Sequence, residues 1–338
     1  GLFRRRAGRT LNDDDVDPSN LRERKLIDFS DKVYVAPLTT VGNLPFRRIL
    51  VDFGADATCG EMSPCEPLLD GSISEWSHVR RHRSEKIFGV QIAANDPTKA
   101  ARTCAAIREL CEDVSFVDVN MGCPLDAVCE RGAGAALARK ANKAEAVVKA
   151  CLQALGPAIP LTFKLRTGWS SAAGSGRRRS RGGAQKNSAH TLVGMAQSWS
   201  VEGRGVEAVF LHGRSRSDRY SKLADWAYIE TCASCQDDAA APLPVIGNGD
   251  ILSYDDFVEK RQIAPTAVNC AMLGRGALIK PWLPLEIKER RTWDISASER
   301  LDVLESFTNY GLDHWGADDC GVNRTRRFLL EWLSFLHR

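Results

Sequence analysis

The sequence predicts a closed barrel of eight parallel strands, each followed by a helix, with further helices after the barrel. Eight short apolar runs alternate with longer amphipathic segments from Lys32 onward, and this alternation implies right-handed crossovers between parallel strands. It covers about 260 residues, the length that a (β/α)8 or TIM barrel of the α/β class requires. The expected strands are Val33–Leu38, Asp56–Cys59, Ile87–Ile92, Phe116–Asn120, Leu161–Arg166, Ala208–His212, Pro244–Asn248 and Ala267–Leu273.

Helical periodicity fills the intervals between these runs. It predicts helices over Pro97–Leu110, Lys143–Leu155, Thr191–Ser200, Tyr254–Arg261 and Trp282–Arg290. An open parallel sheet is the competing fold, but its phosphate-binding G-x-G-x-x-G would lie at the first strand–helix turn. The nearest match, Gly132-Ala133-Gly134, follows the fourth strand instead, so the barrel is favoured.

We divide the chain into three parts. Residues 1–31 are polar, with blocks of opposite charge, and predict a solvated N-terminal leader. Residues 32–293 form the barrel, interrupted at 170–187 by a basic, glycine-rich insertion that either has no role or grips a phosphate backbone. Residues 294–338 begin a helical domain with a capping box at Ser296 and Glu299 and a second helix from near Asn323. The second helix still runs at Arg338, so we expect a truncated domain.

Composition narrows the class of protein. Lys and Arg number 46 against 43 Asp and Glu, so a nucleic-acid site would have to be a local basic patch. No run approaches the roughly 20 apolar residues of a membrane helix. The 11 cysteines lack framework spacing, which is typical of reduced thiols in the cytoplasm or nucleus. The lone C-x-x-C of Cys232 and Cys235 is a weak signal, and we predict no metal site.

Active sites in this fold lie at the carboxyl ends of the strands, so candidate residues are sought there. The fourth strand ends in Asn120-Met121-Gly122-Cys123-Pro124, where glycine and proline shape a rigid turn that presents the Cys123 thiol. Since an ordinary thiol has a pKa of about 8.5, Cys123 can act as a proton donor at neutral pH. The alternative is a small buried side chain without chemistry.

The fifth strand places Lys164 and Arg166 on the face opposite Leu165, because side chains alternate along a strand. Two cations in a barrel lumen need a partner, either a bound anion or reduced cofactor, or an internal carboxylate. A Schiff-base lyase built on Lys164 is a further possibility, since a neighbouring cation such as Arg166 lowers the pKa of an amine.

The last three strands end in basic and glycine-rich segments. His212, Arg214, Arg216 and Tyr220 follow the sixth strand and form a basic, aromatic cluster that suits phosphates and stacked bases. Glycines follow the seventh and eighth strands, where such barrels commonly bind a phosphate through backbone N–H groups. These loops, Gly247–Asp250 and Leu273–Gly276, therefore predict a phosphorylated ligand.

Six segments in this order resemble the tRNA-dihydrouridine synthase family, flavoproteins that reduce a uracil ring in tRNA. They are Ala36–Thr40, Asn120–Pro124, Lys164–Gly168, His212–Arg216, Gly247–Asp250 and Gly274–Ala277. The resemblance extends over about residues 32–338. The segments that look most like the eukaryotic branch acting on the variable-loop uridine, tRNA position 47, are Val41–Arg48, Leu223–Trp226 and Arg326–Leu336.

The resemblance implies a role for each matching residue. Cys123 would be the general acid. The tRNA substrate would be contacted by Asn120, Arg166, Arg214, Arg216 and Tyr220. The cofactor FMN would be bound by Pro37, Leu38, Gln91, Lys164, His212, Asn248, Gly249, Asp250, Gly274 and Arg275. Neither a membrane contact nor an obligate protein partner is implied.

The implied reaction is the reduction of uridine to 5,6-dihydrouridine. Hydride from reduced flavin would add to C6 of the uracil, and Cys123 would protonate C5 from the opposite face. Lys164 and Arg166 would stabilise the anionic reduced flavin and the developing enolate. NADPH would reduce the flavin at the same barrel mouth, because the sequence contains no separate dinucleotide-binding fold.

Two other functions remain open at this point. One is a tRNA-binding protein that keeps the barrel and has lost turnover, for which Cys123 would be dispensable. The other is a flavin dehydrogenase of the dihydropyrimidine type, which acts on small molecules and needs no RNA.

Overall fold

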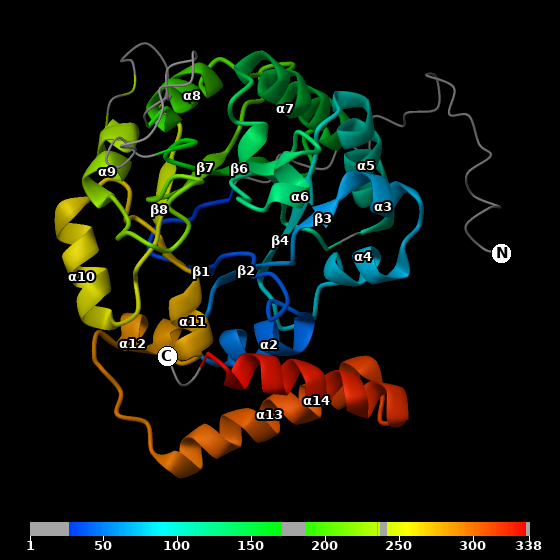
Figure 1. Cartoon of the computed structure of the whole chain (residues 1–338), viewed down its shortest axis with the longest axis vertical. Helices are drawn as coiled ribbons and strands as arrows, with labels where there is room; N and C mark the ends of the chain where they lie inside the picture. The colour runs from blue at the N-terminus through cyan, green and yellow to red at the C-terminus, as the bar shows by residue number, and fades with distance from the viewer. Residues whose placement is uncertain (1–26, 112, 171–186, 235, 237–241, 336–338) are drawn as a thin grey trace.

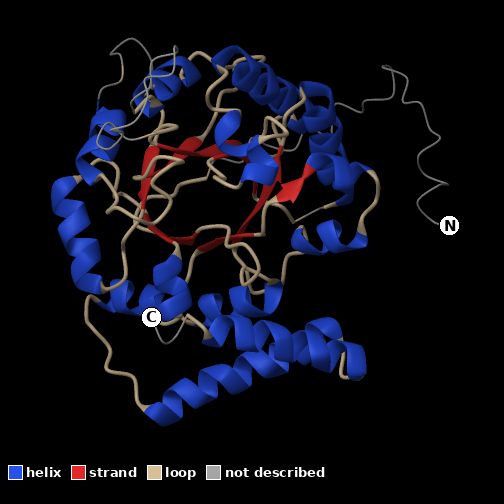
Figure 2. Cartoon of the chain, viewed as in Figure 1, coloured by secondary structure: helices blue, strands red, loops and turns tan. Residues whose placement is uncertain are grey.

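The computed structural model contains the predicted ring of eight parallel strands. It describes residues 27–111, 113–170, 187–234, 236 and 242–335. The strands form a closed ring, because the first strand of the ring pairs with both the second and the last, and the second pairs with the third. Figure 2 shows this ring inside a layer of helices. The ring strands are β1 (Val33–Val35), β2 (Ala57–Cys59), β4 (Ile87–Ala93), β5 (Phe116–Met121), β6 (Leu161–Arg166), β7 (Ala208–His212), β8 (Val245–Asn248) and β9 (Ala271–Leu273).

The largest differences from the predicted strands concern β1, β9 and one extra strand. β1 ends at Val35, shortly before Pro37, which has no N–H to continue the ladder. β9 begins later than predicted because the preceding residues turn, with the N–H of Val268 donating to the carbonyl of Ala264. The extra strand, β3 (Ser63–Pro64), pairs only with β4 among the described strands and lies at the edge of the ring.

Helices surround the ring on the outside (Figure 1). The predicted helix over Pro97–Leu110 has those bounds, and the other four predicted helices differ by a few residues at their ends. The helices that accompany the barrel are α2 (Leu44–Asp52), α3 (Cys65–Leu69), α4 (Ile73–His78), α5 (Pro97–Leu110), α6 (Asp126–Cys129), η2 (Gly134–Ala136), α7 (Ala141–Leu155), α8 (Ala189–Ala196), α9 (Trp226–Ser234), α10 (Tyr254–Ile263), α11 (Arg275–Ile279) and α12 (Leu283–Glu289).

A layer of aromatic side chains fills the lumen at the amino ends of the strands. Tyr34, Phe116 and Phe210 are fully buried, and the centroids of the Tyr34 and Phe210 rings lie 4.9 Å apart. Phe29, from the end of the segment predicted as a leader, packs edge-on against Phe116 and Phe210. A Cβ at Gly89 would lie 2.2 Å from the Phe116 ring, so glycine is required there. This layer fills the lumen near the amino ends of the strands and leaves space for a ligand near their carboxyl ends.

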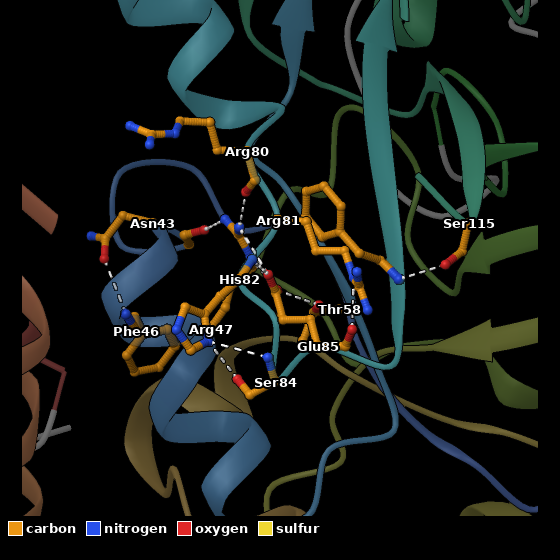
Figure 3. Close-up of polar contacts among 12 residues, drawn as sticks. Asn43, Phe46, Arg47, Thr58, Arg80, Arg81, His82, Ser84, Glu85 and Ser115 are labelled. Atoms are coloured by element: carbon orange, nitrogen blue, oxygen red, sulfur yellow. Dashed lines mark hydrogen bonds and ion pairs between the residues drawn. The ribbon is translucent and has the colours of Figure 1, made fainter. Parts of the chain in front are cut away.

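A buried ion pair connects α2 to the barrel wall (Figure 3). Arg47 Nε lies 2.7 Å from Glu85 Oε1, and these side chains are 3% and 0% exposed. Thr58 on β2 donates its hydroxyl to the same carboxylate, and the backbone N–H of His82 donates to its other oxygen. Arg47 also donates to the carbonyl of Arg80. The pair therefore fixes α2, β2 and the segment after α4 together.

Two helices after the barrel pack as a hairpin against α2, as Figure 1 shows at the lower edge. The first, α13 (Ala297–Trp315), begins at the predicted capping box of Ser296 and Glu299. The second, α14 (Asp319–Leu333), begins before Asn323 because the Asp318 side chain accepts from a backbone N–H in the first turn.

The Trp332 indole of α14 anchors this hairpin to the barrel. Trp332 is fully buried, and its Nε1 donates to the carbonyl of Leu278 in α11 over 3.0 Å. Its ring packs 5.2 Å from the ring of Phe46 in α2 and 5.2 Å from that of Phe307 in α13. One side chain thus joins the hairpin to two elements of the barrel.

Three sequence features fall partly or wholly outside the described residues. These are most of the 1–31 leader, positions 171–186 of the basic insertion, and Cys235 of the C-x-x-C pair, whose other member, Cys232, is buried in α9. Among the helices of the described chain, none combines the length and apolar character needed to cross a bilayer.

Replacing Trp332 by alanine is expected to lower the free energy of unfolding by about 3–5 kcal/mol, because it leaves a large cavity at the joint. Leu301→Ala on α13 is the control, since Leu301 is 55% exposed and its loss is expected to cost less than about 0.5 kcal/mol. Calorimetric or denaturant-induced unfolding measures both. Equal effects of the two substitutions would contradict the anchoring role of Trp332.

Candidate active site

One cavity opens at the carboxyl ends of the strands and collects nearly all predicted site residues. Of these residues only Arg216 lies outside its wall. The cavity is lined by Pro37, Leu38, Gln91, Asn120, Cys123, Lys164, Arg166, His212, Arg214, Tyr220, Asn248, Gly249, Asp250, Gly274 and Arg275. Predicted residues from distant parts of the chain therefore meet in one cavity.

Cys123 lies in the turn after β5, and the side chain of Asn120 shapes this turn. Asn120 Oδ1 accepts from the backbone N–H groups of Cys123, over 2.8 Å, and Gly122, over 3.1 Å. The Asn120 amide donates in turn to Gln91 on β4. Burial raises the pKa of the Cys123 thiol above its ordinary value, so the thiol stays protonated at neutral pH and can donate a proton.

Lys164 and Arg166 both point into the cavity from β6, as alternation along the strand predicts. Lys164 Nζ donates to Asn248 Oδ1 over 3.2 Å, and Arg166 donates to the carbonyls of Gly122 and Ser215. Burial and the neighbouring guanidinium of Arg166 lower the pKa of Lys164 to about 8. Neither cation forms an ion pair with a carboxylate of the described chain, so the internal salt bridges considered as an alternative are not present there.

His212 and Arg214, at the end of β7, carry buried polar atoms that face no partner within the described residues. These atoms are Nδ1 of His212 and Nη1 of Arg214. Burial, together with the charges of Lys164 and the surrounding arginines, holds the pKa of His212 well below its usual value, so its ring is neutral. Buried polar atoms on a cavity wall without a partner indicate a ligand that supplies one.

Asp250, after β8, organises the basic side of the cavity. Its carboxylate accepts two bonds of 2.7 Å from Arg214 and one of 3.2 Å from Arg275, as well as the backbone N–H of Ala224. The guanidinium of Arg275 also lies 4.2 Å from the centre of the half-exposed Tyr220 ring. The Asp250 side chain is therefore occupied in holding two arginines in place at the rim.

Arg216 lies on the rim, next to the cavity and outside its wall. Its guanidinium lies 4.3 Å from the centre of the Trp169 ring and forms an ion pair with Asp126. Arg139 lies 4.5 Å from the centre of the same ring. Two arginines thus share one tryptophan beside the entrance, and the sequence analysis singled out neither Trp169 nor Arg139.

The sequence analysis gave no role to Asp118 and Thr162, which lie below the cavity floor. Both are fully buried, and Thr162 donates its hydroxyl to Asp118 over 2.7 Å. Strand alternation places Thr162 on the face of Lys164, and it could have identified Asp118 in the same way, two residues before Asn120. Both therefore face the lumen.

The structure defines a TIM barrel with a polar, cation-rich cavity at its mouth, and comparison with known proteins identifies the family. Residues 34–317 match the dihydrouridine synthase (Dus) family. The chain belongs to this family.

The relatives that match this chain carry more specific names. It is 50% identical over 328 residues to a Xenopus tropicalis protein named tRNA-dihydrouridine(47) synthase (NAD(P)(+))-like, covering 97% of this chain and 47% of that one. A Homo sapiens protein of the same name is 50% identical, with 97% and 46% covered. The Coprinopsis cinerea tRNA-dihydrouridine(47) synthase (NAD(P)(+)) is 47% identical, with 95% and 45% covered. The chain spans about half the length of these relatives.

Solved structures with a similar fold are distant in sequence. A 6-hydroxypseudooxynicotine amine oxidase from Pseudomonas geniculata aligns with a TM-score of 0.55 at 11% identity, covering 79% of this chain and 49% of that one. A 2-naphthoyl-CoA reductase aligns with a TM-score of 0.54 at 11% identity, covering 79% and 52%. These similarities concern the barrel fold alone.

Gly249→Ala is expected to destabilise the protein by about 1–3 kcal/mol. Gly249 has φ 131°, and an added Cβ would lie 2.7 Å from the Cβ of Ala224. Gly194→Ala in α8 is the matched control, because an added Cβ there meets open space and is expected to stabilise the helix by about 0.5–1 kcal/mol. Thermal unfolding of the two variants measures both effects, and a stability of Gly249→Ala equal to that of Gly194→Ala would show that the loop after β8 is not specially constrained.

Proposed function

We propose that this chain carries the catalytic barrel of an FMN-dependent tRNA-dihydrouridine synthase that reduces a uridine of tRNA, at variable-loop position 47, to 5,6-dihydrouridine. The observation that carries the proposal is the convergence of a protonated thiol, Cys123, with Lys164 and Arg166 in one cavity. The names of relatives that are 50% identical over nearly the whole chain support the substrate and the tRNA position.

The cavity fits FMN on the chemistry of its wall. His212 Nδ1 and Arg214 Nη1 are buried without a partner in the described chain, and Lys164, Arg166 and Arg275 add positive charge for a phosphate or an anionic ring. FMN would be held by Pro37, Leu38, Gln91, Lys164, His212, Asn248, Gly249, Asp250, Gly274 and Arg275. Bound FMN, reduced by NADPH, would supply a hydride to C6 of the uracil.

Cys123 supplies the proton that completes the reduction. Addition of hydride at C6 moves the electron pair of the 5,6 double bond toward C5 and O4 of the uracil. The Cys123 thiol then transfers its proton to C5 and is left as a thiolate, which regains a proton from solvent. The raised pKa of this thiol suits the role of a general acid, because it keeps the proton on sulfur at neutral pH until the substrate needs it.

Asn120 and Arg166 hold the uracil, and arginines at the rim bind the tRNA strand. Arg166 is fixed by its bonds to two backbone carbonyls, so its charge is preorganised to stabilise the anion that develops on O4. Arg214, Arg216 and Tyr220 line the path from the cavity to the outer rim, where phosphates and unstacked bases are expected. The cysteines without framework spacing support a location in the cytoplasm or nucleus.

Cys123→Ala is expected to lower the rate of dihydrouridine formation in tRNA by about 10²–10⁴-fold, because the general acid is lost. Mass spectrometry of the tRNA product measures this rate. Bound flavin and its reduction by NADPH are expected to stay unchanged, since neither uses the thiol. Cys111→Ala, at the end of α5 and away from the cavity, is the control with normal activity. Full activity of Cys123→Ala would contradict the proposal and favour another acid.

FMN affinity is expected to fall as the pH rises through about 8, where Lys164 of the free protein loses its proton. An anionic ligand stabilises the charged ammonium, so binding is strongest below this pKa and weakens above it. Titration of FMN fluorescence between about pH 7 and 9.5 measures the dissociation constant. In Lys164→Arg the dependence is expected to disappear, because a guanidinium stays charged throughout this range. The same slope in both proteins would exclude Lys164 as the titrating group.

A further inference from the structure

We infer that Asp118 is a positioning residue for the Cys123 turn: its buried carboxylate fixes the orientation of the Gln91 and Asn120 amides, and these amides fix the backbone that carries the thiol. The inference rests on the proposed function, because it concerns the residue that donates the proton there.

Three neighbouring strands place Asp118 and its two hydrogen-bond partners, Gln91 and Thr162, at one level of the barrel. Asp118 on β5 is in register with Gln91 on β4 and with Thr162 on β6. Asp118 Oδ2 accepts from Gln91 Nε2 over 2.7 Å, and Oδ1 accepts from the Thr162 hydroxyl over 2.7 Å. Asp118 and Thr162 are fully buried and Gln91 is 1% exposed, so water cannot readily replace either bond.

The hydrogen bonds continue from Gln91 to the turn. Gln91 Oε1 accepts from Asn120 Nδ2 over 2.8 Å. Asn120 Oδ1 then accepts from the backbone N–H groups of Cys123 and Gly122 over 2.8 and 3.1 Å. The carboxylate of Asp118 is therefore linked to the backbone of Cys123 through two amides.

The two ends of this series of bonds determine the orientation of both amides. An ionised carboxylate only accepts hydrogen bonds, and a backbone N–H only donates. Between them, Gln91 must turn its NH₂ toward Asp118 and Asn120 must turn its carbonyl toward Cys123. Rotating either amide by 180° would bring two acceptors or two donors together in a buried place.

This polarity also determines what Asn120 offers to a ligand. Its carbonyl already accepts two backbone bonds, and one amide hydrogen is donated to Gln91. The remaining amide hydrogen is the group that Asn120 can present to the cavity, which it lines. Such a donor complements a carbonyl oxygen of uracil and not the amino group of cytosine.

Amide hydrogen exchange at Gly122 and Cys123 tests the inference directly. Asp118→Ala removes the acceptor of Gln91 and is expected to speed exchange at both N–H groups by about tenfold or more. Asp118→Asn is expected to keep exchange slow, because its carbonyl accepts from Gln91 while its NH₂ donates to the Thr162 hydroxyl. Thr162→Val is the control, because it removes the other buried hydrogen bond of Asp118 and leaves the Asp118–Gln91 bond intact. Exchange at Gly122 and Cys123 is expected to stay slow in this variant too.

Turnover provides the second measurement, made on flavin-loaded protein. In Asp118→Ala, oxidation of the reduced protein by tRNA is expected to slow by about 10–100-fold, because the acid is displaced. Flavin reduction by NADPH, which does not use Cys123, is expected to change by less than about threefold. Asp118→Asn is expected to restore the tRNA step. An equal loss in both steps would indicate a structural defect and overturn the assignment.

A second variant keeps the inference testable if Asp118→Ala does not fold. Gln91→Met fills a similar volume and breaks both links of the amide series, so it is expected to produce the same fast exchange at Gly122 and Cys123. Unchanged exchange in either folded variant would overturn the positioning role. The exchange measurement needs no tRNA, so it tests the role of Asp118 independently of the proposed function. Failure of the wild-type chain to form dihydrouridine would contradict the proposed function, and the exchange rates would still decide whether Asp118 positions the Cys123 turn.

Discussion

Closure of the strands into one ring is the constraint on which the site depends. Because the eight ring strands are parallel and paired in a cycle, their carboxyl ends meet at a single rim. Residues as distant in the chain as Pro37, Cys123 and Arg275 therefore line one cavity. The aromatic layer around Phe116 and Phe210 fills the lumen near the amino ends of the strands. Polar side chains near the carboxyl ends therefore find their partners among one another, or in water or a ligand that enters at the rim.

Charge within the cavity is unbalanced toward the positive. Among the described residues of its wall, Asp250 is the single acidic side chain, and two arginines share its carboxylate. Lys164 and Arg166 instead donate to neutral oxygens. Burial, together with the neighbouring positive charges, lowers the pKa of Lys164 and that of His212, so the His212 ring is neutral. Desolvated cations of this kind strongly favour an anionic ligand, and a phosphorylated, reducible cofactor would satisfy both the rim and the lumen.

Two buried carboxylates serve different parts of the molecule. Glu85 is paired with Arg47, and this ion pair holds α2, against which the C-terminal hairpin packs. Asp118 is held by the neutral groups of Gln91 and Thr162, and burial raises its pKa to about 6. The charge of Lys164 acts against this shift, although the two groups form no ion pair. The connection of Asp118 to the Cys123 turn gives the carboxylate a role, so that Glu85 supports the scaffold and Asp118 supports the chemistry.

From the sequence alone we predicted the ring of strands, the family and most of the residues that line the cavity, because periodicity and strand-end motifs are local properties of the chain. β6 and β7 have the predicted bounds, and the capping box at Ser296 begins α13 as predicted. Tertiary structure alone decided which groups are partners. The turn of Asp250 toward two arginines, the position of Arg216 on Trp169 and the path from Asp118 to Cys123 all cross between strands or loops. Such contacts depend on the register and closure of the barrel, which no local pattern specifies.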